Sequence, residues 1–153
     1  SEGLIGFLWA VGVIAEIALF AFARPLLVRI GIPGMLLLGA ACGIVRWSGT
    51  GATAELWLLV PCQVLHGFTF GATHLAGMTF IQRHVAPAMS ASAQALYASL
   101  GMGMAMGLTM AASGWLYAQL GGYSFWVMAG LSAGSFALAL LIRRQWRNDL
   151  EIG

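Results

Sequence analysis

The sequence predicts an all-α membrane protein, a polytopic bundle of five transmembrane helices. Of its 153 residues, 60% are hydrophobic and only 8% are charged, and the mean hydropathy is +0.88. A soluble domain carries about 25% charged residues, because it must cover its surface. Five apolar runs, each long enough to cross a hydrocarbon core about 30 Å thick, follow one another along the chain. The composition therefore argues against a cytosolic enzyme, a nucleic-acid-binding protein and a disordered chain.

The five predicted spans cover, to within a few residues, 3–23, 32–47, 55–81, 90–118 and 123–142. We expect helices because lipid offers the backbone no hydrogen-bond partners. The strands of a membrane barrel would alternate polar and apolar residues, and these runs do not. The connections are short and contain Arg, Pro, Gly or Ser, so sequential helices should be antiparallel neighbours. We predict no soluble domain and no long linker.

The arginines predict how the bundle is oriented. Six of the seven fall on one side of the five predicted crossings: Arg24, Arg29, Arg83, Arg143, Arg144 and Arg147. The positive-inside rule makes that side cytoplasmic. We therefore expect a multi-pass protein of the cell (inner) membrane, surrounded by the lipid bilayer, with Ser1 outside and the carboxy-terminus in the cytoplasm.

Glu16 is the clearest functional candidate, because it lies beyond the middle of the first span among isoleucines and alanines. A charged side chain at a helix centre costs roughly 2.5–3.5 kcal/mol on insertion scales. Intramembrane ionisable residues usually face a protein interior or a water-filled cavity. A carboxylate balanced between burial and a neighbouring cation could load and release a proton. The alternative is a fixed structural pair or a neutral, hydrogen-bonded acid.

Arg46 lies near the outer end of the second predicted span, next to Trp47. Its side chain could snorkel outward past the tryptophan to the membrane surface. Otherwise it faces the cavity and binds an anion or a carboxylate through two parallel hydrogen bonds, the geometry to which Arg is suited. We predict that Arg46 is a substrate-binding residue.

The third span places Gln63, His66 and His74 on one helix face, because spacings of three and eight residues return to the same side. Histidine is the side chain that titrates near neutral pH. We predict that Gln63 and His66 line the substrate site and that His66 also takes part in proton coupling. His74, Gln94 and Tyr97 are secondary cavity candidates. For all of these residues, interhelical hydrogen bonding is the alternative.

No motif for catalysis, metal binding or a cofactor accompanies these residues. The two cysteines, Cys42 and Cys62, lie in apolar runs without metal-ligand spacing, and we expect them to act as small hydrophobic residues. The chain contains no HExxH, no GxSxG and no phosphate-binding glycine loop. We therefore expect no enzyme, no cofactor, no metal and no nucleic-acid partner.

Glycine is frequent, with 21 residues, and predicts close helix packing. Ser99, Gly103, Gly107 and Ala111 fall four apart in the fourth span, a spacing that lets helix backbones approach one another in lipid. The stripe fits static packing or a seam at which helices slide or rock. Pro61 should kink the third span, because it removes a backbone hydrogen bond.

Several segments in order are similar to a known family of membrane proteins. They are ARPLLVRIG at 23–31, GIVRWSG at 43–49, LHGFTF at 65–70, FIQRH at 80–84 and QALYASLG at 94–101. Together they resemble the carboxy-terminal half of a major facilitator superfamily permease, closest to the phenylpropionate-permease-like family, which is related to the lactose and nucleoside proton symporters. The resemblance covers essentially the whole chain. It implies twelve spans in two six-helix halves with a central site, of which these five look like the eighth to the twelfth.

The resemblance also assigns roles to residues. Arg46 and His66 match the membrane Arg and His of the lactose symporters. Thr69 stands where that family has a proton-handling carboxylate, and Val13 stands where it has an acid in the first of these spans. Since neither Thr nor Val titrates, coupling would use Glu16, His66 or groups outside this chain.

The resemblance implies a fragment of a proton-coupled symporter that moves a small organic solute by alternating access. The solute would be an aromatic carboxylate such as 3-phenylpropionate. A sugar or nucleoside proton symporter is one alternative, and a non-transporting membrane scaffold or sensor is another. The implied partners are protons, the solute and the amino-terminal half of the same transporter. We expect these five helices not to fold stably alone.

Overall fold

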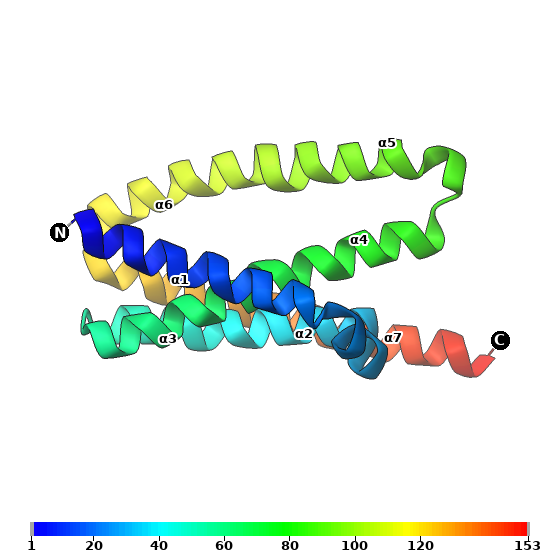
Figure 1. The fold of residues 1–153 in the computed structure, drawn as a ribbon, viewed down its shortest axis with the longest axis horizontal. Coiled ribbons are helices and arrows are strands. Elements are labelled where there is room, and N and C mark those ends of the chain that lie inside the picture. Colours follow the sequence, from blue (N-terminus) through cyan, green and yellow to red (C-terminus); the bar gives the residue numbers. More distant parts are fainter. Residues whose placement is uncertain (1, 153) are drawn as a thin grey trace.

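The protein consists of long helical rods joined by tight turns (Figure 1). The computed structural model describes residues 2–152, with side chains up to residue 146. The elements are α1 (Glu2–Ala21), α2 (Ala23–Ala52), α3 (Leu56–Gly67), η1 (Phe68–Ala72), α4 (Thr73–His84), α5 (Pro87–Tyr97), η2 (Ala98–Ala105), α6 (Met106–Leu120), η3 (Gly121–Tyr123) and α7 (Ser124–Ile152). Because α3–η1–α4 and α5–η2–α6 are each continuous, the described elements make five rods.

The rods are long and apolar enough to cross a membrane. By length and composition, four continuous helical segments of the described chain qualify: Glu2–Ala21, Ala23–Ala52, Leu56–His84 and Pro87–Trp146. The last segment reverses at Gly121, whose φ of +54° is accessible to glycine at little cost, and so divides into α5–η2–α6 and α7. The predicted fold class, a helical membrane bundle, is confirmed.

Two predicted connections are helical instead. The segment between the first two spans forms the start of α2, which Pro25 suits because its fixed φ favours a first helical turn. Gly31, with φ +67° and ψ −179°, then breaks the helix before it continues. At the other end α2 runs on to Ala52, where Thr50 Oγ1 donates a hydrogen bond of 2.9 Å to the Arg46 carbonyl.

The third rod departs from α-helical geometry at a different place from the one predicted. Pro61 lies within the regular helix α3, in its second turn. The irregular part is η1, a π-helical stretch from Phe68 to Ala72, and η2 forms a similar stretch in the next rod. Such stretches are frequent at functional sites. The π-helical turn of η1 directly follows the predicted polar face of the third span.

Helix α2 is the centre of the packing. It packs against α7 and against the α3–η1–α4 rod, and α1 packs mainly on α3 and η1. The buried core joins these elements through Leu19, Ile32, Met35, Ala72 and Ala76. The α5–η2–α6 rod contributes no buried residue and runs apart from this core over most of its length (Figure 1).

The arginines of different connections meet at one end of the bundle. Arg83 and Arg143 line a cavity of about 290 Å³ together with Gly31 and Trp146. Arg46 lies beside Trp47, which stacks on Phe125 near the start of α7, at the other end of that helix. The orientation relative to the cytoplasm remains a prediction, and Ser1 and Gly153 lie outside the described residues.

Candidate functional site

Two glycines bring α1 and α3 into close contact at the candidate site. A Cβ atom at Gly67 would lie 2.7 Å from the Ala15 carbonyl carbon and the Glu16 amide nitrogen, so only glycine fits this backbone contact. A Cβ atom at Gly12 would lie 3.2 Å from His66 Cδ2. The packing therefore places Glu16 of α1 and His66 of α3 along one helix–helix seam.

Glu16 is half-buried at this seam. Its Cγ atom lies 3.7 Å from the position that a Cβ atom would take at Gly71. Among the described residues, Glu16 has no hydrogen-bond donor or cationic partner. Its carboxylate is therefore not held by a structural ion pair within this part of the protein, and it is free to exchange a proton with water or with a group from elsewhere.

His66 is half-buried beside Gln63, whose carbonyl and side-chain oxygens also face Gly12. The Nδ1 atom of His66 is enclosed and has no partner among the described residues. An enclosed ring nitrogen without a hydrogen bond is costly, so a partner is expected. Water, a solute or a residue beyond the described part of the chain would satisfy it. The imidazole is thus positioned to take up or release a proton.

Thr69 connects Arg46 to His66. The Arg46 Nη1 atom donates to Thr69 Oγ1 at 3.5 Å, and Thr69 Oγ1 donates to the His66 carbonyl at 2.9 Å. The guanidinium carbon of Arg46 lies 4.3 Å from the ring centroid of Trp47, which stacks on Phe125 at 6.0 Å. The described residues provide no carboxylate for this half-buried cation. Arg46 is held on two sides while its charge stays uncompensated, an arrangement that suits an anion.

Sequence reasoning missed the linking role of Thr69, which it treated only as a non-titrating substitution. The available signal was its position three residues after His66 in a helix. At that spacing a threonine hydroxyl bonds a backbone carbonyl of the preceding turn and so presents its lone pairs to a neighbouring helix. That the neighbour is Arg46 depends on how α2 and α3 pack.

His74 and Tyr97 form a second cluster, one rod over from the seam. The His74 ring stacks on Phe70 at 5.7 Å and 5°, and lies 5.8 Å from the Tyr97 ring. The His74 Nδ1 atom is also enclosed without a partner among the described residues. Gly77 makes room for Tyr97, since a Cβ atom there would lie 3.1 Å from the ring. The cluster joins α4 to α5 and continues the row of rings that begins at His66.

Gln94 does not join the other predicted site residues. Its Nε2 atom donates to Ser90 Oγ at 3.1 Å within α5. No group of three or more His, Cys, Asp or Glu side chains that could hold a metal ion occurs among the described residues. Within this part of the protein, the arrangement therefore favours binding and proton exchange.

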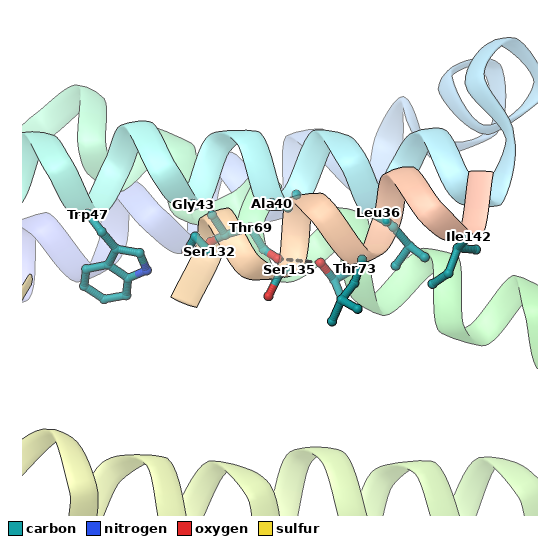
Figure 2. Close-up of a pocket in the computed structure, with 12 residues that line it drawn as sticks. Leu36, Ala40, Gly43, Trp47, Thr69, Thr73, Ser132, Ser135 and Ile142 are labelled. Atoms are coloured by element: carbon teal, nitrogen blue, oxygen red, sulfur yellow. Dashed lines mark hydrogen bonds between the residues drawn. The ribbon is translucent and has the colours of Figure 1, made fainter. Parts of the chain in front are cut away.

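A cavity of about 320 Å³ lies beside Thr69 (Figure 2). Hydroxyl groups from η1, α4 and α7 face it: Thr69, Thr73, Ser132 and Ser135. Gly39 and Gly43 of α2 form its floor, where Cβ atoms would lie 2.6 Å from Thr73 Oγ1 and 2.8 Å from Ser132 Oγ. The sequence did not identify the two serines, because isolated hydroxyl groups are common in transmembrane helices.

Apolar rods of membrane length that carry Glu, Arg and His at internal positions define a polytopic membrane transporter. The chain belongs to the MFS_1 like family of major facilitator permeases, whose family model matches residues 1–128. The family resemblance seen in the sequence is thereby confirmed.

Several relatives are transporters. A protein named probable 3-phenylpropionic acid transporter from Escherichia coli (strain K12) is 40% identical over 129 residues, 84% of this chain and 34% of that protein. The uncharacterized transporter YwbF of Bacillus subtilis (strain 168) is 24% identical over 97% of this chain and 37% of its own length. A maltose permease of Geobacillus stearothermophilus is 26% identical over 92% of this chain and 36% of its own length.

The chain spans about a third of the length of these relatives. No solved structure matches it significantly. The fold and the site geometry described above therefore stand on this structure alone.

Proposed function

We propose that this chain is part of a proton-coupled symporter for a small aromatic carboxylate of the 3-phenylpropionate type. The observation that carries the proposal is Arg46. This half-buried cation is held by Thr69 and Trp47 and lacks a carboxylate among the described residues. A solute carboxylate would supply the missing charge through paired hydrogen bonds, which are the strong kind. The 40% identity to a protein named for 3-phenylpropionic acid supports the aromatic part of the solute.

Glu16 and His66 are the proposed proton-coupling pair. They lie on the same α1–α3 seam, and Thr69 connects the His66 carbonyl to Arg46. Uptake of an anion at Arg46 would therefore change the electrostatic field at both titratable groups. Coupled uptake follows if protonation of the pair favours solute binding, and if release of the solute toward the cytoplasm favours proton release.

The test is solute uptake by the full-length parent protein in proteoliposomes. We expect labelled 3-phenylpropionate to accumulate when the outside is more acidic, and to equilibrate without accumulation when the gradient is collapsed. Labelled maltose is the second arm, because one relative is a maltose permease. Gradient-driven uptake of maltose alone would move the proposal to sugar symport. No flux of either solute, with retained binding of a protein partner, would favour a membrane scaffold or sensor.

Proton coupling itself is tested by Glu16→Gln and His66→Asn, which keep shape and remove titration. We expect each to lower gradient-driven accumulation at least tenfold. Glu55→Gln and His84→Asn are matched controls, because both residues are exposed at helix ends, and they should accumulate solute as the wild type does. Gradient-dependent uptake at the wild-type level by both seam variants would remove Glu16 and His66 from the coupling role.

A further inference from the structure

The α5–η2–α6 rod is held to the rest of the structure only near its two ends. Tyr97 packs against Gly77 at one end, and Tyr117 meets Phe125 edge to face at 6.1 Å near the other. Between these contacts none of the residues of the rod is buried. Figure 2 shows the ribbon of this rod running opposite the hydroxyl-lined cavity.

Three cavities between this rod and the α2–α4–α7 layer join into one long groove. The outer cavity, about 600 Å³, shares Trp47 with the middle cavity of about 320 Å³. The middle cavity shares Leu36, Thr73 and Ile142 with the inner cavity of about 340 Å³. We call the three together the long groove.

The long groove has the length of a membrane-spanning helix. Along α7 it extends from Ser124 in the outer cavity to Trp146 in the inner one. At 1.5 Å per helical residue this is about 33 Å, close to the thickness of the hydrocarbon core. A small solute would fill only a fraction of that length.

Both walls of the long groove carry small side chains. On the α5–η2–α6 rod, Gly101, Ala105, Thr109 and Ser113 fall four apart and line the outer cavity. On the opposite wall, Gly39, Gly43, Ser132 and Ser135 line the middle cavity. Small residues on both sides let a further helix backbone approach closely, which is how transmembrane helices associate.

The hydroxyl groups of the groove have already used their hydrogens. Thr69, Thr73, Ser132 and Ser135 each donate to a carbonyl of the preceding turn, at 2.9, 2.9, 3.0 and 3.1 Å. They therefore present only lone pairs to the groove. A carboxylate needs donors and would find none in these four, whereas the Cα–H groups of a packed helix are donors suited to such oxygens.

We infer that one apolar transmembrane helix, contributed by the part of the protein outside residues 1–153, docks along the long groove. The relatives are about three times as long as this chain, so in them two thirds of the polypeptide lies outside the matched region. The groove thus accepts a helix of the same transporter, while Arg46, outside the lining of all three cavities, is left for the solute. The inference rests on family membership and on the groove, and it does not depend on which solute is moved.

The test places a photoreactive benzophenone amino acid at position 105 of the full-length protein in its native membrane. Ala105 lines the groove, whereas Ala111 is also exposed on the same rod but lines none of the three cavities. Irradiation should link position 105 to one apolar helix outside residues 1–153, identified by mass spectrometry, with at least fivefold higher yield than from position 111. Linkage mainly to lipid, to a second copy of this chain or to residues within 1–153 would overturn the inference.

A bulky side chain gives an independent measurement. Ala105→Phe should lower the yield of correctly folded full-length protein at least fivefold, because the ring would occupy the space of the docked helix. Ala111→Phe should stay within twofold of the wild type. Equal yields for the two variants would contradict docking. A parent that transports no aromatic carboxylate, but still gives the position-105 linkage, would reject the proposed function and leave this inference in place.

Discussion

At the scale of single residues, Arg46 concentrates the chemistry of this chain. The sequence left open whether it snorkels outward or faces the protein, and the structure places it against Thr69 and over Trp47. A buried cation that loses its counter-charge is destabilised by several kcal/mol. The anion that we propose for Arg46 is therefore part of the stability of the loaded transporter as well as of its selectivity.

Replacing Arg46 should impair solute recognition before it impairs folding. We expect Arg46→Ala to raise the KM for 3-phenylpropionate by about 10-fold to 100-fold, the range for a lost hydrogen bond to a charged group. Arg46→Lys keeps the charge but loses the paired geometry, and it should fall between the two. Arg83→Lys, exposed at the end of α4, is the control. An unchanged KM in Arg46→Ala uptake assays would exclude the anion role.

Thr69 offers a sharper test of the same idea. Thr69→Glu places a carboxylate where the hydroxyl now meets Arg46, so the protein would satisfy the cation and compete with the solute. We expect uptake of the aromatic carboxylate to fall at least tenfold. Thr69→Gln has the same size without the charge and should retain more uptake than Thr69→Glu. Equal loss in the two variants would show that size alone, and no charge competition, governs this position.

At the scale of the helices, glycines decide how closely the rods approach. The stripe predicted in the fourth span meets no neighbouring helix among the described residues at its two glycines. A Cβ atom at Gly107 would have no atom within 4 Å, and one at Gly103 would meet only its own rod at Ala98. Gly67 of α3 makes the tightest contact with another backbone, that of α1. Spacing alone predicts a packing surface without predicting which surface is used.

The contrast between two glycines gives a stability prediction. Gly67→Ala should destabilise the full-length protein by about 1–3 kcal/mol, because its Cβ atom would press on the Ala15–Glu16 backbone, which cannot move aside without separating α1 from α3. Gly107→Ala meets open space and should be neutral or slightly stabilising. The measurement is the thermal unfolding midpoint of the detergent-purified protein. Equal midpoints for the two variants would refute the close contact.

At the scale of the whole molecule, this bundle has a groove and an ionisable seam that its own helices do not cover. We therefore expect residues 1–153 expressed alone to be polydisperse in detergent and to unfold without a cooperative transition. Coexpression with the rest of the transporter should restore a monodisperse complex. Size-exclusion chromatography and thermal unfolding are the measurements. A monodisperse, cooperatively unfolding chain on its own would contradict this expectation.

The sequence by itself determined the membrane class, the family and most of the rods, because apolar runs of membrane length and the need for internal backbone hydrogen bonds leave few alternatives to helices. It also identified Glu16, Arg46 and His66, because a charged or titratable group in an apolar run is costly enough to stand out. Only the tertiary structure decided that Thr69 meets Arg46, that Gly67 carries the closest contact, and that the break falls at Gly31. Those facts depend on which faces of two helices meet, and between apolar helices in lipid many pairings have similar free energies until complementary shapes and a few hydrogen bonds select one.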